Sequence, residues 1–151
     1  MALFKANQVV AKLPVMTGDR ASNNIVIVGD FLVPTGFASG DVVEMVPLPG
    51  GYVLTDLIAD HASLGTTVTS DFGILSGDFD STGARTCGAQ FAAAQALQTA
   101  GLKRAAAAGA TRVAPTTNTR GIGFVASTVA TPSVGAAIRF PMTCRPQIEG
   151  V

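Results

Sequence analysis

The stretch 41–77 constrains the fold of this chain more than any other part of the sequence. It contains three apolar segments, which are separated by turn-forming residues at 47–51 and at 61–65. Proline cannot donate to a β-ladder and paired glycines favour a turn with positive φ, so the first segment has a definite end. The pattern predicts three consecutive strands, at 42–48, 52–60 and 66–76. Short strands at this spacing indicate an antiparallel β-sandwich or barrel.

Two further regions extend the strand pattern. Residues 22–34 predict a strand with apolar residues on both faces, and residues 120–130 and 134–146 predict two closing strands. In the last strand one face is entirely apolar, and it is formed by Val134, Ala136, Ile138, Phe140, Met142 and Cys144. Within this strand, Pro141 predicts an edge position or a bulge.

The Ala-rich stretch 89–110 differs in character from the rest of the chain. Alanine is the best helix former and β-branched residues are nearly absent here, which predicts a helix near 89–100 and a shorter turn near 102–108. Phe91, Ala94, Leu97 and Leu102 would then form one apolar stripe. The alternative is a disordered, low-complexity segment.

The N-terminal residues 1–21 allow two interpretations. Their apolar residues follow no period, which fits either a first edge strand with a loop or an arm that lies on a neighbouring subunit. We expect a single all-β domain over 1–151 with the following organisation: an extended N-terminal arm at 1–21, a sandwich core at 22–77 and 119–148, and a loop plus helical insert at 78–118, the helix covering about 89–108.

The composition favours a protein that packs against other proteins. Charged residues make up 13% of the 151 residues, where about a quarter is usual. The formal net charge of zero argues against a nucleic-acid partner. No apolar run reaches the roughly 18 residues that span a bilayer, and the N-terminus lacks the pattern of a signal peptide. We therefore expect a soluble protein that is made in a cytoplasm and has no membrane partner.

No residue pattern predicts catalysis. His61 is the only histidine and lacks an orienting partner, because the adjacent Asp60 would point to the other face of a strand. Residues 78–83 begin like an EF-hand loop, but its twelfth position is Ala89 where the bidentate Glu is needed. Asp56 and Asp71 could face each other across adjacent strands, but the chain has one Tyr and no Trp to form a sugar platform. We expect no enzyme, no metal site and no cofactor.

The two cysteines, Cys87 and Cys144, predict no zinc site because neither belongs to a CxxC pair. We favour free buried thiols over a disulfide, since two cysteines in a cytoplasmic product are usually unpaired. The place of Cys144 on the apolar face of its strand supports this interpretation.

Several segments resemble a pattern found in small head proteins of tailed bacteriophages. The matching segments are DVVEMVPLP at 41–49, the strand at 52–60 that ends in acidic residues, and DFGILSG at 71–77. Residues 120–146 are similar to a closing hairpin of the form T-V-x-x-A-P-T-x-G-x-I-R. The resemblance covers residues 22–77 and 119–146, and the Ala-rich insert lies outside it.

The resemblance implies a head decoration protein, also called a cement or minor capsid protein, with a jelly-roll-like β-sandwich core. Such a protein is a structural virion component on the capsid exterior, where it binds the major capsid protein and stabilises the shell, here as an expected homotrimer. The alternative is a carbohydrate- or receptor-binding jelly roll on a virion surface, suggested by the acidic loop 78–80. The expected interface residues are apolar side chains of the arm and the Ala-rich segment: Phe4, Val9, Leu13, Val15, Met16, Phe91, Leu97 and Leu102.

Overall fold

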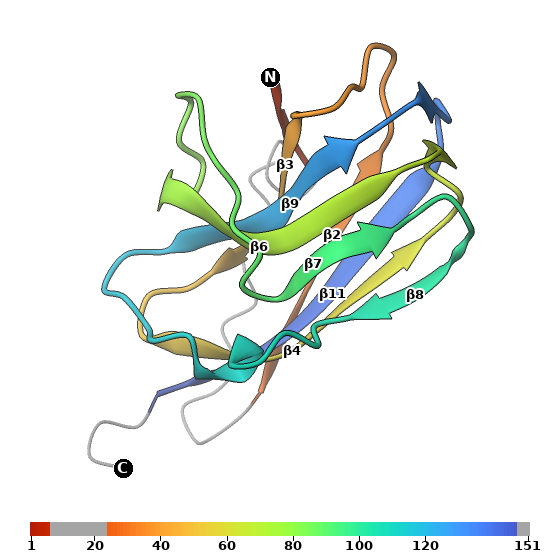
Figure 1. The fold of residues 1–151 in the computed structure, drawn as a ribbon. Helices are drawn as coiled ribbons and strands as arrows, with labels where there is room; N and C mark the ends of the chain where they lie inside the picture. The colour runs from red at the N-terminus through yellow and green to blue at the C-terminus, as the bar shows by residue number, and fades with distance from the viewer. Residues whose placement is uncertain (7–23, 148–151) are drawn as a thin grey trace.

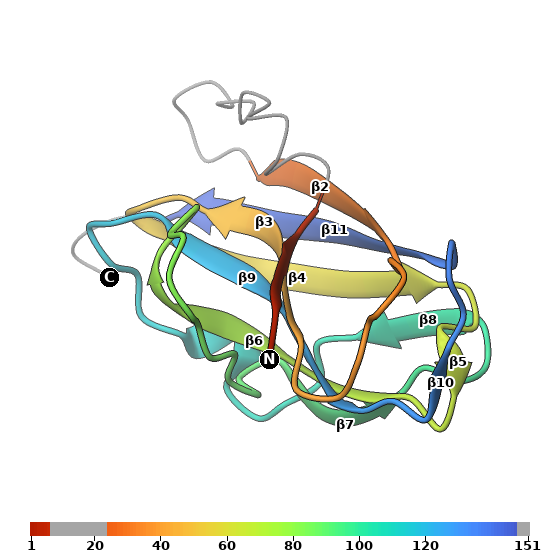
Figure 2. The ribbon, with the colours of Figure 1, turned by 90° about the horizontal axis from the view of Figure 1, so that it is seen from above.

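The computed structural model, which describes residues 1–6 and 24–147, is a sandwich of two β-sheets (Figures 1 and 2). The first sheet, called the β9 sheet below, has the order β1-β3-β9-β6-β7, and the second, the β11 sheet, has the order β2-β11-β4-β8. Neighbouring strands are antiparallel except β1 and β3, which are parallel. A two-stranded ladder of β5 and β10 lies at one end of the sandwich (Figure 2).

The strands of the β9 sheet are β1 (Leu3–Lys5), β3 (Val42–Leu48), β9 (Arg120–Thr128), β6 (Thr69–Asp78) and β7 (Ala92–Ala96). Those of the β11 sheet are β2 (Ile25–Leu32), β11 (Ala137–Pro146), β4 (Tyr52–His61) and β8 (Gly101–Arg104). The remaining elements are β5 (Gly65–Thr66), β10 (Thr131–Pro132) and one 3-10 turn, η1 (Ala110–Arg112).

Phenylalanine rings fill the space between the sheets. Phe140 of β11 meets Phe72 of β6 edge to face with a centroid distance of 5.3 Å, and Phe31 of β2 meets Phe124 of β9 at 6.1 Å. Such T-shaped pairs bring the positive ring edge to the negative ring face, which adds to the stabilisation from burial. The rings therefore hold the two sheets together at the centre of the core.

The alternating pattern of the closing strand is confirmed over the length of β11. Its apolar residues Ile138, Phe140, Met142 and Cys144 are fully buried. Val134 and Ala136 precede the strand, and Val134 is exposed. The predicted strand at 42–48 coincides with β3, and the segment predicted at 66–76 is divided into β5 and β6 by Thr67, which has a positive φ of 50°.

The prediction of an edge position for Pro141 is wrong, because β11 lies between β2 and β4. The pairs of β11 with β4 run from Arg139↔Asp60 directly to Met142↔Leu57, so the proline falls where that ladder lacks paired residues. A bulge follows between Thr143 and Cys144. The proline, which has no N–H to donate, is thus accommodated by a local gap in one ladder.

The predicted helical insert at 89–108 is not present. Residues 92–96 form β7 and residues 101–104 form β8, each an edge strand of a different sheet (Figure 1). Phe91 and Leu97 are fully buried, while Ala94 and Leu102 are exposed, so the predicted helical stripe does not share one face. Alanine favours a helix by at most about 0.7 kcal/mol per residue relative to other common residues. Burial of Phe91 and Leu97, together with the pairing of β7 with β6 and of β8 with β4, outweighs this preference.

The first residues of the chain form an edge strand. β1 pairs in parallel with β3, and the backbone N–H of Ala2 donates to the Asp41 carboxylate at 2.7 Å. This agrees with the edge-strand interpretation for residues 3–5. Most of the predicted arm, residues 7–21, lies outside the described residues.

Candidate functional site

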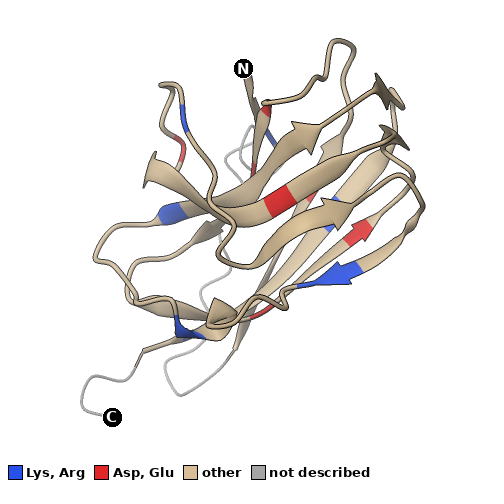
Figure 3. Ribbon diagram, viewed as in Figure 1, with Lys and Arg blue, Asp and Glu red and all other residues tan. Residues whose placement is uncertain are grey.

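The outer face of the β11 sheet carries mixed charged and apolar side chains. Arg139 pairs with Asp30 (Nε to Oδ1, 2.5 Å), and Arg104 forms a two-pronged pair with Asp56 in which both distances are 2.8 Å. In each pair the carboxylate accepts hydrogen bonds from the guanidinium, which raises the pKa of Arg104 and of Arg139. These pairs leave the face with locally compensated charges (Figure 3).

Exposed apolar side chains surround these ion pairs. Val26 and Leu32 at the two ends of β2 are 58% and 56% exposed, and Leu102 of β8 is 69% exposed. Along the ladders, Leu32 lies opposite Ala137, Val26 opposite Thr143 and Leu102 opposite Asp60. A face with ion-paired charges and exposed aliphatic groups has the chemistry of a protein contact surface.

The outer face of the β9 sheet is different because a loop covers it. Residues 79–91 connect β6 to β7 and fold back along β6, with a hydrogen bond from Ser76 N–H to Thr86 O at 2.9 Å. From this loop, the side chain of Arg85 enters the protein and forms a buried ion pair with Glu44 of β3. Arg85 also donates to the backbone oxygens of Ser76 (2.6 Å) and Gly77 (3.3 Å).

Glu44 is fully buried in this cluster, and only one of its carboxylate oxygens has a partner among the described residues. Space for the carboxylate comes from Gly121 on β9, where an added Cβ would lie 2.0 Å from Glu44 Oε1. Lys5 of β1 pairs with Asp80 nearby, so the cluster fixes both the loop and the N-terminal strand. This pair of buried charges was not predicted from the sequence, where the loop had the pattern of a solvated turn.

The EF-hand-like residues do not form a metal site. Asp80 pairs with Lys5, and Asp78 accepts a hydrogen bond from Asn118 Nδ2 at 3.0 Å. Their carboxylates are therefore committed to different side chains. Among the described residues, no three His, Cys, Asp or Glu side chains are grouped closely enough to hold a metal ion.

The remaining candidates for chemistry are separated from one another. His61 is buried at the end of β4, where Nδ1 lies 2.9 Å from Ala62 O and Nε2 has no partner among the described residues. Asp56 lies in the β11 sheet and Asp71 in the β9 sheet, so the predicted carboxylate pair across adjacent strands is wrong. Asp71 instead accepts hydrogen bonds from Ala94 N–H at 2.6 Å and Ser127 Oγ at 3.0 Å.

Both cysteines are free thiols, as predicted. Burial raises the pKa of Cys144 to about 11 and that of Cys87 to about 12. The thiolate, which is the reactive form, is therefore scarce at neutral pH for both residues. Neither thiol is suited to nucleophilic catalysis.

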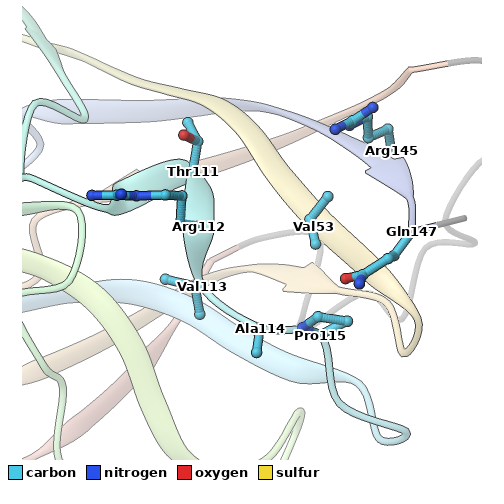
Figure 4. A pocket seen from close by; sticks show the side chains of 8 residues that line it. All are labelled: Val53, Thr111, Arg112, Val113, Ala114, Pro115, Arg145 and Gln147. Carbon is cyan, nitrogen blue, oxygen red and sulfur yellow. The ribbon is translucent and has the colours of Figure 1, made fainter. Parts of the chain in front are cut away.

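A hollow with a volume of about 440 Å³ is open to solvent (Figure 4). It is lined by the residues that follow η1 and by the ends of β4 and β11: Val53, Thr111, Arg112, Val113, Ala114, Pro115, Arg145 and Gln147. The side chains of Arg112 and Arg145 lie well apart and do not meet at a common point (Figure 4). The described lining residues include no carboxylate, histidine or cysteine.

The expected interface residues differ in how far they are buried. Phe91 and Leu97 are fully buried in the core, so other side chains form the surface above them. Phe4 is half-buried against Phe31 and Phe37, and Leu102 is exposed on β8. Val9, Leu13, Val15 and Met16 lie outside the described residues. Among the described residues, no helix is long and apolar enough to cross a membrane.

The fold and the surface described above define the class of this protein as an all-β sandwich with two sheets that are mainly antiparallel. The chain is similar to chains in two solved phage structures. One, from "Capsid of Ralstonia phage GP4", has a TM-score of 0.90 and 28% identity over 97% of this chain and 99% of that chain. The other, from "Cyanophage Pam1 capsid asymmetric unit", has a TM-score of 0.65 and 16% identity over 91% of this chain and 96% of that chain, and shows the fold alone.

The sequence matches no protein-family model and no curated protein. Its structural neighbours are nevertheless phage capsid proteins, and both are covered almost from end to end. This supports a structural role in a virion and association with other capsid components.

Proposed function

We propose that this protein decorates the outer surface of a phage capsid by binding the major capsid protein, and that it stabilises the assembled shell. The observation that carries the proposal is the near-complete superposition on a chain of the Ralstonia phage GP4 capsid, at 28% identity and a TM-score of 0.90.

The strand order supports a jelly-roll core for this protein. β2-β11-β4-β8 faces β3-β9-β6-β7, so eight strands form two four-stranded sheets and β1 is added at one edge. From β2 to β6 each successive main strand lies in the other sheet, and β9 and β11 repeat this alternation. This order is the one expected of a double Greek-key jelly roll, a fold used by viral capsid and lectin domains, and it therefore supports the proposed core.

A glycan-binding function, which also suits a jelly roll, has less support. It depended on free carboxylates in the loop after β6, but Asp78 and Asp80 are engaged with Asn118 and Lys5. Among the described residues that line the open hollow, there is no aromatic side chain on which a sugar could stack.

The decoration function is tested by adding the purified protein to expanded phage heads that lack it. We expect saturable co-sedimentation with the heads and a higher disruption temperature of the shell, because a ligand that binds only the assembled state stabilises that state. Unexpanded heads and an unrelated β-sandwich of similar size are the controls. Protein that remains in the supernatant at all concentrations, with an unchanged disruption temperature, would contradict the proposal.

A further inference from the structure

The hollow beside η1 differs from the rest of the described surface in its charge. Four cations have acidic partners: Lys5, Arg85, Arg104 and Arg139. The other cations of the described chain form no ion pair with a described residue, and they are Lys103, Arg112, Arg120 and Arg145. Of these, only Arg112 and Arg145 line the same hollow. Because its described lining includes no carboxylate, the hollow has two positive charges without a compensating acid.

The turn between β3 and β4 fixes both walls of this hollow. The Gly51 N–H donates to Thr116 O at 2.8 Å, and Gly51 O accepts from the Gln147 N–H at 2.9 Å. Gly51 has a positive φ of 76°, and a Cβ added at Gly50 would lie 2.1 Å from Thr117 O. Two glycines thus hold the loop after η1 close to the end of β11. A site with fixed walls binds a partner at a lower cost of ordering.

The two arginines offer hydrogen-bond donors on opposite sides of the hollow. Arg112 is the last residue of η1, and Arg145 follows the buried Cys144 in β11, so alternation along the strand directs it away from the core. Both arginines are exposed, and neither guanidinium donates to a described residue. Their side chains lie well apart (Figure 4). Two carboxylates on an extended segment suit this arrangement better than one small anion.

The lining also contains apolar side chains. Val53 of β4 and, in the loop after η1, Val113 and Pro115 are half-buried. The volume of about 440 Å³ falls within the roughly 300–1,000 Å³ that is usual for ligand pockets. Guanidinium groups bind carboxylates through charge-assisted hydrogen bonds, and apolar lining residues favour an apolar side chain. The lining therefore fits a segment that has an apolar side chain between two acidic ones.

We propose that this hollow, called the Arg112/Arg145 site below, binds an extended acidic segment of another capsid protein, with one carboxylate at each arginine. The inference rests on the proposed decoration function and names a contact through which it would act. A nucleic acid fits less well, because such a partner is bound by neutralising several phosphates. The site has two cations, and the formal net charge of the chain is zero.

Binding to expanded phage heads that lack the protein tests the site. R112Q/R145Q removes both positive charges but keeps polar side chains, and we expect it to bind roughly tenfold more weakly than the unchanged protein at low ionic strength. Added salt should narrow this difference, since exposed charges are screened. Both positions are exposed, so the circular dichroism spectrum and the melting temperature should stay almost unchanged.

T82E/A84E is the matched control. It changes the net charge by the same amount at exposed positions of the loop after β6, and we expect it to bind as the unchanged protein does. Undiminished binding of R112Q/R145Q, or equal weakening of both variants, would overturn the site while the decoration function stands. Failure of the unchanged protein to bind the heads would contradict the decoration function, and this inference with it.

Carbodiimide cross-linking tests the chemistry of the partner. R112K/R145K retains both charges and supplies amines, which a carbodiimide joins to adjacent carboxylates. On decorated heads we expect mass spectrometry to find amide links from positions 112 and 145 to acidic residues of another capsid protein. R104K is the internal control, because position 104 lies beside Asp56 of the same chain. If position 104 is linked to Asp56 but positions 112 and 145 are linked to no other protein, the proposal is wrong.

A short DNA duplex is the probe for the alternative class of partner. We expect no retention of the duplex at physiological salt, in agreement with the net charge of zero. Retention by the unchanged protein that is lost in R112Q/R145Q would assign a polyanion to the site and overturn the acidic peptide.

Discussion

At the scale of single residues, the buried pair of Glu44 and Arg85 is the feature with the largest predicted energetic effect. Both side chains are almost completely removed from solvent, and Arg85 is also held by two backbone oxygens. The net gain from such a pair is small because both charges are desolvated, but removal of one partner leaves the other charge buried and uncompensated.

We predict that R85M lowers the free energy of unfolding by about 3–5 kcal/mol, measured by urea denaturation. The double variant E44M/R85M is expected to lose much less than the sum of the two single variants, because no charge then remains buried. R139M, which removes an exposed pair, is the control and should leave the midpoint almost unchanged. Additive effects of E44M and R85M would contradict the proposed coupling.

This pair also shows what a single sequence conceals. Glu44 lies in a strand and Arg85 in a polar loop, and neither residue type indicates a partner. The two residues are 41 positions apart in the sequence. Only the return of the loop over β3, together with the absence of a side chain at Gly121, brings them together. The alternation in β11 could be predicted because all the information lies within one strand, where side chains point to opposite faces in turn.

At the scale of elements, β7 is the most instructive strand, because its composition favours a helix. Its conformation depends on contacts with distant residues: Phe91 N–H donates to Phe72 O at 3.0 Å, and Leu97 N–H donates to Val68 O at 2.8 Å. These partners cannot be deduced from the local sequence. Phe91 and Leu97 are six residues apart, and an even spacing is compatible with side chains on one face of a strand. This spacing was the signal in the sequence that could have indicated a strand here.

β7 also contains an irregular residue with an energetic cost. Ala94 has a φ of 49°, in the left-handed region, where an L side chain is disfavoured by about 1–2 kcal/mol. Its N–H is held there by the Asp71 carboxylate at 2.6 Å.

We predict that A94G stabilises the protein by about 0.5–1 kcal/mol, since glycine adopts this conformation without strain but loses more backbone freedom on folding. A96G, at an exposed position of the same strand that pairs with Thr69, is the matched control and should be destabilising. Thermal denaturation monitored by circular dichroism measures both changes. A lower melting temperature for A94G than for the unchanged protein would contradict the assigned conformation.

At the scale of the whole molecule, the all-β antiparallel architecture could be predicted because alternating apolar residues and turn residues identify most of the strands in the sequence. The β11 sheet requires pairing between strands that are distant in sequence, such as β2 with β11, and this order was available only from the structure. The expected interface residues were chosen by hydrophobicity alone, which does not distinguish a core residue such as Phe91 from a surface residue such as Leu102.

The assignment to phage capsids joins two independent observations. The segments 41–49 and 71–77 resemble head proteins of tailed phages, and 97% of the chain superposes on a chain of the Ralstonia phage GP4 capsid at 28% identity. In the structure these segments lie in β3 and β6 of the β9 sheet, where their residues build the core, so they identify the scaffold and not the contact surface.

A cryo-electron microscopy reconstruction of the virion is the direct test of capsid decoration by this protein. We predict density on the exterior of the shell that fits this two-sheet sandwich and contacts the major capsid protein. A reconstruction from a phage in which the gene is deleted, showing the same shell without that density, is the control. Absence of the sandwich from the exterior of the wild-type capsid would contradict the proposed function.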